Sequence, residues 1–158
     1  MPVGRAGAGG PRSLPDRPGR LRRAHAGGAR AEAQYLLAHS WLDEGNRPEA
    51  IDAWETAAAM PGMWPVARSE AWMVAGTGLP ERGRVEERRS MLRSCVEFHG
   101  GEPWHVRECL LALGRSYLPE GRTDDARRDF RALRGRSDLS TEQREEVESA
   151  LSGPVQPN

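Results

Sequence analysis

Residues 37–54 read LAHSWLDEGNRPEAIDAW, and their arrangement of small, bulky and acidic residues recurs twice further along the chain. The stretch is centred on Gly45, and two later glycines, Gly83 and Gly121, follow at intervals of 38 residues. A small residue stands seven places before each glycine, a bulky one four places before, and another bulky one nine places after. These positions are Ala38, Gly76 and Gly114; Trp41, Leu79 and Tyr117; and Trp54, Leu92 and Phe130. So many matched offsets indicate an internal repeat.

The spacing predicts a helical hairpin at each repeat. A glycine at the end of one helix can adopt the left-handed conformation that satisfies the last free carbonyls. The small residue before it lets a second helix approach closely, and the two bulky residues fill the seam between the helices. We therefore expect an all-α fold of three hairpins, with helices at residues 29–44, 47–60, 66–80, 84–98, 104–118, 123–134 and 141–151.

The middle hairpin departs from the other two in two places. Arg88 stands where its neighbours have the alanines Ala50 and Ala126. Pro80 falls in the last turn of the predicted helix 66–80, where a proline removes a backbone hydrogen bond. We expect this helix to end early or to bend.

Residues 31–61 and 107–134 resemble tetratricopeptide repeats, which are helix-turn-helix units of about 34 residues. The matching residues are Leu37, Ala38, Trp41, Gly45, Ala50, Trp54, Ala57 and Pro61 in the first stretch, and Leu113, Gly114, Tyr117, Gly121, Ala126 and Phe130 in the second. The resemblance implies a right-handed α-solenoid of stacked hairpins. Ser140 and Gln143 have the spacing of a capping box, and helix 141–151 would close the stack by covering its last apolar face.

The resemblance also implies that the protein is a protein–protein interaction module. In that family, a peptide or helix of the partner lies in the concave groove lined by the first helices of the hairpins. The matching positions here are Tyr35, His39, Leu42, Met73, Thr77, Leu111, Arg115 and Leu118. They would form an apolar groove suited to an amphipathic helix or an extended peptide. Burial of the same surface in a homo-oligomer is an alternative.

One group of residues has the chemistry of a metal site. Cys95, His99, His105 and Cys109 are spaced Cys-x3-His-x5-His-x3-Cys across the turn between the second and third hairpins. Two thiolates and two imidazoles can hold Zn²⁺ tetrahedrally, so a zinc-stabilised scaffold is one alternative function. The other interpretation is that no metal binds, and that Cys95 and Cys109 pack between adjacent repeats as small hydrophobes.

Charge is distributed unevenly along the chain. The net charge is zero, yet residues 1–30 contain seven Arg and a single acid, Asp16. Residues 1–28 are also rich in Gly and Pro, which predicts a disordered arm there, a folded domain at 29–153 and a tail at 154–158. A basic arm can contact phosphates, so a nucleic-acid-associated adaptor is a second alternative. The arm has no Phe, Tyr or Trp to stack on bases, which argues against nucleic acid as the partner.

The sequence contains no recognisable catalytic motif. His39 has no Ser or Cys nucleophile at a matching spacing, and Gly7-Ala8-Gly9-Gly10 lacks the Lys and the preceding strand of a phosphate-binding loop. We expect neither enzymatic activity nor a cofactor. No apolar run approaches the length of a membrane span, and the N-terminus lacks the apolar region of an export signal. These features predict a cytoplasmic protein that does not bind membranes.

Overall fold

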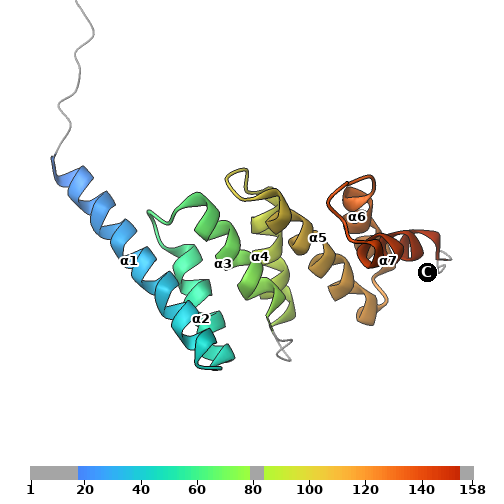
Figure 1. Cartoon of the computed structure of the whole chain (residues 1–158), viewed down its shortest axis with the longest axis horizontal. Coiled ribbons are helices and arrows are strands. Elements are labelled where there is room, and N and C mark those ends of the chain that lie inside the picture. Colours follow the sequence, from blue (N-terminus) through green and yellow to red (C-terminus); the bar gives the residue numbers. More distant parts are fainter. Residues whose placement is uncertain (1–17, 79–83, 154–158) are drawn as a thin grey trace, which may run out of the picture.

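The computed structural model describes residues 18–78 and 84–153. Within these ranges every regular element is a helix, so the predicted all-α class is confirmed (Figure 1). The helices are α1 (Pro18–Asp43), α2 (Arg47–Ala59), α3 (Pro65–Thr77), α4 (Val85–Glu97), α5 (Pro103–Tyr117), the short 3-10 helix η1 (Leu118–Glu120), α6 (Thr123–Leu133) and α7 (Thr141–Ser152). Residues 1–17 of the predicted arm and the predicted tail, 154–158, lie outside the described residues.

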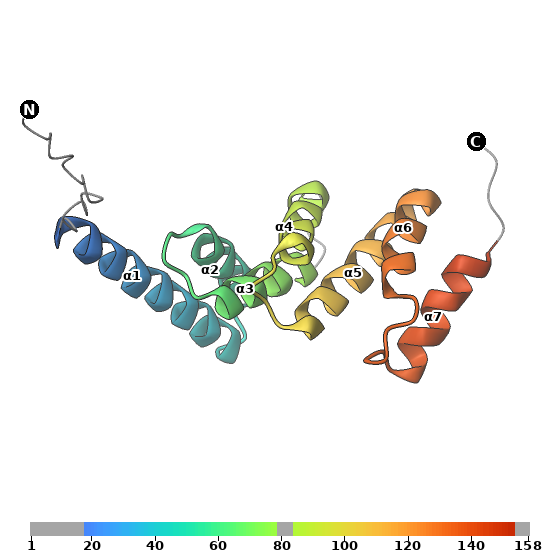
Figure 2. The same cartoon turned by 90° about the horizontal axis from the view of Figure 1, so that it is seen from above.

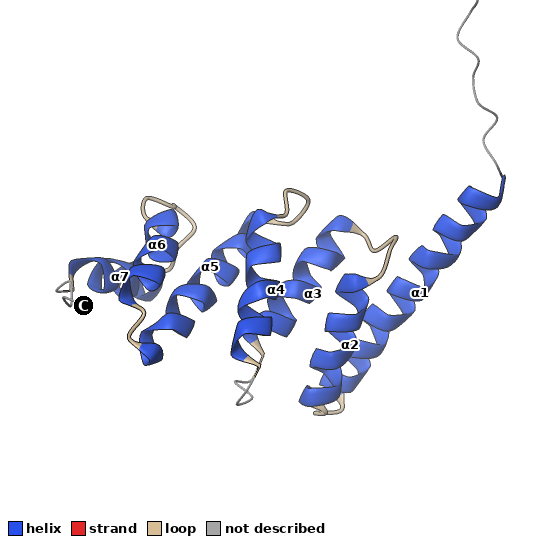
Figure 3. Cartoon of the chain, turned by 180° about the vertical axis from the view of Figure 1, so that it is seen from behind, coloured by secondary structure: helices blue, strands red, loops and turns tan. Residues whose placement is uncertain are grey.

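The helices pack in the order in which they follow one another along the chain. Each α-helix contacts the next, and α3 also contacts α5. The result is a row of helices with α1 at one end and α7 at the other (Figures 1 and 2). Helices α1 and α2, α3 and α4, and α5 and α6 form three hairpins, which Figure 3 shows from behind.

The predicted pairs of small and bulky residues lie in the seams of these hairpins. A Cβ atom added to Gly76 of α3 would lie 2.5 Å from Cγ of Leu92 in α4, so this close approach requires glycine. In the first hairpin, Ala38 and Trp54 are both buried and belong to one apolar cluster. The bulky residue before the glycine, Trp41, is half-buried against the same cluster.

Two of the three repeated glycines end a helix in the predicted conformation. The φ angles of Gly45 and Gly121 are 81° and 69°, in the left-handed region. The backbone N–H of Asn46 donates to the carbonyl of Trp41 over 2.8 Å, and that of Arg122 reaches Tyr117 in the same way over 3.1 Å. These bonds satisfy carbonyls that the helix itself leaves free. The third glycine, Gly83, lies outside the described residues.

The first helix begins earlier than predicted. The sequence analysis starts it at residue 29, after a disordered arm, whereas α1 begins at Pro18, so residues 18–28 are helical. Gly27 contributes to the packing of this part of α1, because a Cβ atom there would lie 3.3 Å from the carbonyl oxygen of Pro61. This contact brings α1 against the loop that follows α2, which supports the helix beyond the first repeat.

The predictions about the ends of α3 and α7 are confirmed. α3 ends at Thr77, short of the predicted end at residue 80. At the start of α7, Oγ of Ser140 accepts from the backbone N–H of Gln143 over 3.2 Å, and Oε1 of Gln143 accepts from the N–H of Ser140 over 3.0 Å.

Among the described helices, none combines the length and the apolar character needed to cross a bilayer.

Candidate functional site

Three of the eight predicted partner-binding residues line one groove. This α3–α5 groove has a volume of about 650 Å³. Its walls come from the C-terminal half of α3, the N-terminal half of α4, and α5. It is lined by Met73, Gly76, Thr77, Gly78, Val85, Arg88, Arg89, Leu92, Trp104, Glu108, Ala112, Arg115 and Ser116. The predicted residues Met73, Thr77 and Arg115 therefore share a surface.

The other predicted residues lie elsewhere. Tyr35 lines a small cavity between α1 and the loop before α3. Leu42 lines a cavity beside Ile51 of α2, and Thr77 lines this cavity as well as the α3–α5 groove. Leu118 is exposed at the end of α5, away from the groove lining. The prediction that Leu111 binds a partner is wrong. Its side chain is fully buried in the core cluster that includes Leu139 and Val147, so a partner cannot contact it.

Tyr35 and His39 take part in internal contacts. The hydroxyl of Tyr35 donates to Oε2 of Glu70 over 2.5 Å, which links α1 to α3. Burial and the bond to Glu70 raise the pKa of Tyr35 above its ordinary value. The ring of His39 lies edge-on to Tyr35, at 4.6 Å between centroids, and to Trp54, at 5.2 Å. These contacts give both residues a role in packing.

The apolar part of the α3–α5 groove is dominated by Trp104 at the start of α5. Its side chain is 41% exposed, although Trp is a residue that proteins usually bury. Its ring lies edge-on to that of His105, with 4.2 Å between the ring centroids. Met73, which is 8% exposed, and the half-buried Ala112 line the groove beside the Trp104 ring.

The polar rim of the groove is held by α7. Arg115 donates from Nε and Nη2 to the two carboxylate oxygens of Glu146, over 2.7 and 2.6 Å. This pairing lowers the pKa of Glu146. The amide of Gln143 donates to Glu108 over 3.3 Å. Both rim residues of α5 are thus engaged by the last helix, which fixes their positions.

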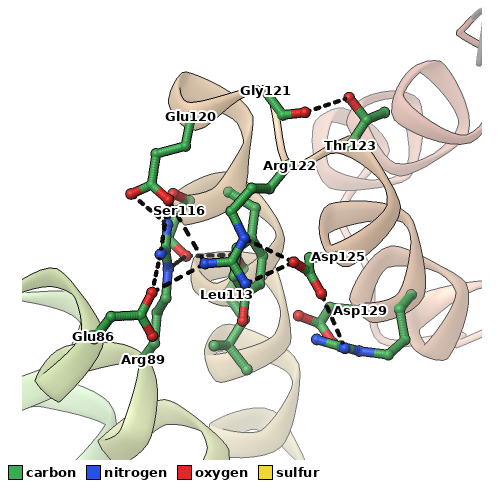
Figure 4. A network of polar contacts seen from close by, with 12 residues as sticks. Glu86, Arg89, Leu113, Ser116, Glu120, Gly121, Arg122, Thr123, Asp125 and Asp129 are labelled. Atoms are coloured by element: carbon green, nitrogen blue, oxygen red, sulfur yellow. Dashed lines mark hydrogen bonds and ion pairs between the residues drawn. The ribbon is translucent and has the colours of Figure 1, made fainter. Parts of the chain in front are cut away.

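One residue of the groove lining is a buried arginine that sequence reasoning missed. Arg89 is only 1% exposed. It donates from Nε to Oγ of Ser116 over 2.9 Å and from Nη1 to Glu86 and Glu120 over 2.5 and 3.0 Å (Figure 4). Its guanidinium lies over the ring of Tyr117, 4.3 Å from the centroid. These bonds join α4 to α5 and satisfy the buried charge.

A second arginine completes this network. Arg122 lies 4.6 Å from the centroid of the Tyr117 ring and pairs with Asp125 and, over 3.1 Å, with Glu86 of the preceding hairpin (Figure 4). Arg84, 38 residues earlier, likewise pairs with an acid three residues on and with acids of the hairpin before it. The recurrence of a Gly-Arg pair at this interval was the available signal in the sequence.

The four candidate zinc ligands are not gathered at one point of the described structure. Cys95 and Cys109 are free and fully buried, and Oγ of Ser69 lies 3.7 Å from the sulfur of Cys95 and 3.0 Å from Nδ1 of His105. Ser69 thus stands between His105 and the thiols, and His99 is exposed. In the described part of the chain, no three His, Cys, Asp or Glu residues are grouped to hold a metal ion.

The buried thiols belong to the core. The hydrogen bond to Cys95 and burial raise the pKa of Cys109. Both cysteines lie in one core cluster with Leu110 and Leu113. This is the packing between adjacent hairpins that the second interpretation of these residues predicts.

Comparison of the chain with family models, curated proteins and solved structures found no match in any of the three.

Proposed function

We propose that this protein is a protein–protein interaction module in which a peptide or helix of a partner binds in the α3–α5 groove. We further propose that the three hairpins and α7 form a right-handed stack of the tetratricopeptide type. The matched 38-residue offsets and the helix order support that arrangement. Function then resides in a surface that holds a partner, without chemistry.

The observation that carries the proposal is the exposed ring of Trp104 in a groove of about 650 Å³. This volume is in the range of pockets that bury a ligand. Tryptophan is enriched among the residues that dominate binding energy at protein interfaces. Met73 and Ala112 extend the apolar surface beside it. Such a groove suits the apolar face of a helix or the alternate side chains of an extended segment.

The free cysteines support a site of action in the cytoplasm. Both Cys95 and Cys109 carry no disulfide, and thiols stay reduced most readily in that compartment.

The proposal is tested by affinity capture with the full chain as bait and two variants. W104E places a charge in the groove, whereas L118E changes a leucine of similar exposure, 46%, outside it. We expect a specific partner to bind the wild type and L118E and to bind W104E at least tenfold more weakly. Circular dichroism and unfolding midpoints establish that all three proteins are folded.

Equal capture of every partner by the wild type and W104E would contradict the proposal. Loss of the partner in L118E but not in W104E would move the binding surface to the C-terminal end of α5, as the sequence-based set of residues allowed.

A further inference from the structure

Arg88 occupies a position where the fold needs only a small residue. The corresponding residues of the first and third hairpins, Ala50 and Ala126, are both buried. Arg88 is buried as well, at 5% exposed, although it carries a charge and a long side chain. Because alanine serves the same place in two hairpins of this chain, helix packing alone does not account for the arginine.

The guanidinium of Arg88 is poorly satisfied within the protein. Nη1 makes one long bond, 3.5 Å to the carbonyl oxygen of Ala75. Nε and Nη2 are buried and have no hydrogen-bond partner among the described residues. The adjacent Arg89 is equally buried, yet it is bonded to Ser116, Glu86 and Glu120. A buried charge without partners destabilises a fold, so an external partner for Arg88 has a physical reason.

The structure leaves room for such a partner. Arg88 lines the α3–α5 groove together with Met73, Leu92 and Trp104. A Cβ atom at Gly78 would lie 3.0 Å from Nη1 of Arg88, so the glycine at the end of α3 provides space for the guanidinium. Arg88 is therefore a lining residue of an apolar groove, with its Nε and Nη2 atoms just beneath the surface.

The two unpaired nitrogens identify the ligand group. Nε–H and Nη2–H form the side of a guanidinium that binds both oxygens of a carboxylate. The described residues include two examples of this geometry: Arg115 binds Glu146 and Arg136 binds Asp138, each through Nε and Nη2. In Arg88 the same two nitrogens have no carboxylate, and both are covered, so a ligand would reach them after the side chain turns toward the groove.

We propose that Arg88 binds the side-chain carboxylate of an Asp or Glu in the partner segment, whose neighbouring apolar residues contact Met73 and Trp104. The inference rests on the proposed function and specifies the chemistry of the partner. The apolar residues that line the groove come from both α3 and α5. A partner segment with apolar residues on both sides of its acid can therefore contact both helices. Three arginines line the groove, and two of them, Arg89 and Arg115, are already paired with acids of this chain. Arg88 is then the one guanidinium left for the partner, so we expect the partner segment to contribute one carboxylate.

The first test is selection of peptides by the full chain. The probe is a random 12-residue library displayed with blocked C-termini, offered to the wild type, R88M and W104E. We expect the wild type to select segments in which one Asp or Glu lies among apolar residues. R88M should lose the preference for the acid, and W104E should lose binding. A second library, with free C-termini, distinguishes a side-chain carboxylate from a terminal one.

Each alternative outcome has its own meaning. Peptides that need Trp104 but show no acid preference, or that R88M selects equally well, would overturn the role of Arg88 and leave the groove function standing. Selection only from the library with free C-termini would overturn the side-chain source. If the libraries yield no peptide whose binding depends on Trp104, both proposals are overturned.

The second test changes the peptide and leaves the protein intact. For a selected peptide, Glu→Gln (or Asp→Asn) should weaken binding to the wild type about 30-fold or more, as expected when a buried charge pair loses one partner. R88M should bind the two peptides within about threefold of each other. Equal binding of both peptides by the wild type would refute the inference, whether or not R88M folds.

Discussion

Gly114 and Phe130 are in such close contact that a Cβ atom on Gly114 would lie 2.7 Å from Cζ of the Phe130 ring and 2.8 and 2.9 Å from two further ring atoms. The ring belongs to α6 and is fully buried. The missing side chain at residue 114 is therefore what allows α5 and α6 to pack at this distance.

We predict that G114A destabilises the protein by about 1–3 kcal/mol, the usual cost of an added methyl group in a packed core. This would occur although alanine favours a helix more than glycine does. The free energy of unfolding in urea measures it. G28A is the matched control, since its Cβ would be 3.4 Å from the Gly62 oxygen, an ordinary contact. If G114A is as stable as G28A, the seam is looser than described.

Removal of Arg89 should be costly. R89M abolishes the bonds to Ser116, Glu86 and Glu120 and the contact with Tyr117. We expect a loss of about 2 kcal/mol or more, because several bonds from one buried charge are lost together. R134M, which removes an exposed ion pair with Glu148, should change stability by about 1 kcal/mol or less. Denaturant unfolding of both variants checks the difference; similar losses would show that burial of Arg89 adds nothing.

His105 should make stability depend on pH. Burial lowers the pKa of His105, against smaller upward effects of Glu70 and Glu102. Below the ordinary value of about 6.5, the unfolded chain then takes up a proton that the folded protein does not bind. Stability should therefore be complete above about pH 6.5 and decline as the pH falls toward the lowered pKa of the folded state.

This dependence is tested by measuring the unfolding free energy at several pH values from about 7.5 to about 5, a range that brackets the ordinary pKa of histidine. In H105N, we expect a flatter profile over this range, at a lower overall stability because of the lost packing. H99N changes an exposed histidine of the same helix-turn-helix region. If H99N flattens the profile as much as H105N does, the assignment to His105 is wrong.

The start of α7 should depend on its capping box. S140A removes the hydroxyl that accepts from the N–H of Gln143. The expected loss is about 1 kcal/mol, as for other N-cap substitutions. Urea unfolding measures it, with S137A, a change in the exposed loop before the helix, as control. If S140A and S137A lose the same amount of stability, the loss in S140A does not come from removal of the cap.

Residues near one another in sequence account for most of what could be predicted. Gly45 and Gly121 end helices because only a left-handed residue closes these turns. Gly76 and Leu92 meet because a hairpin places these offsets opposite each other. The start of α1 at Pro18 was missed, since the support of Gly27 by Pro61 is a contact between distant segments.

The candidate site was predicted only in part. Positions 35, 73 and 111 are equivalent in the repeat, yet Tyr35 is half-buried, Met73 is 8% exposed at the groove and Leu111 is entirely buried. The repeat pattern treats these positions as alike. Their exposure differs because each hairpin has different neighbours, with the core around α7 enclosing Leu111.

The sequence by itself determined an all-α chain with three hairpins and a capped last helix, because helix ends, turns and seams depend on residues a few positions apart. Only the tertiary structure decided which side chains are available to a partner. Arg88 and Arg89 are adjacent in one helix, and both are buried. One is satisfied by α5 and the other borders an open groove, because their partners come from other helices whose positions no local pattern specifies.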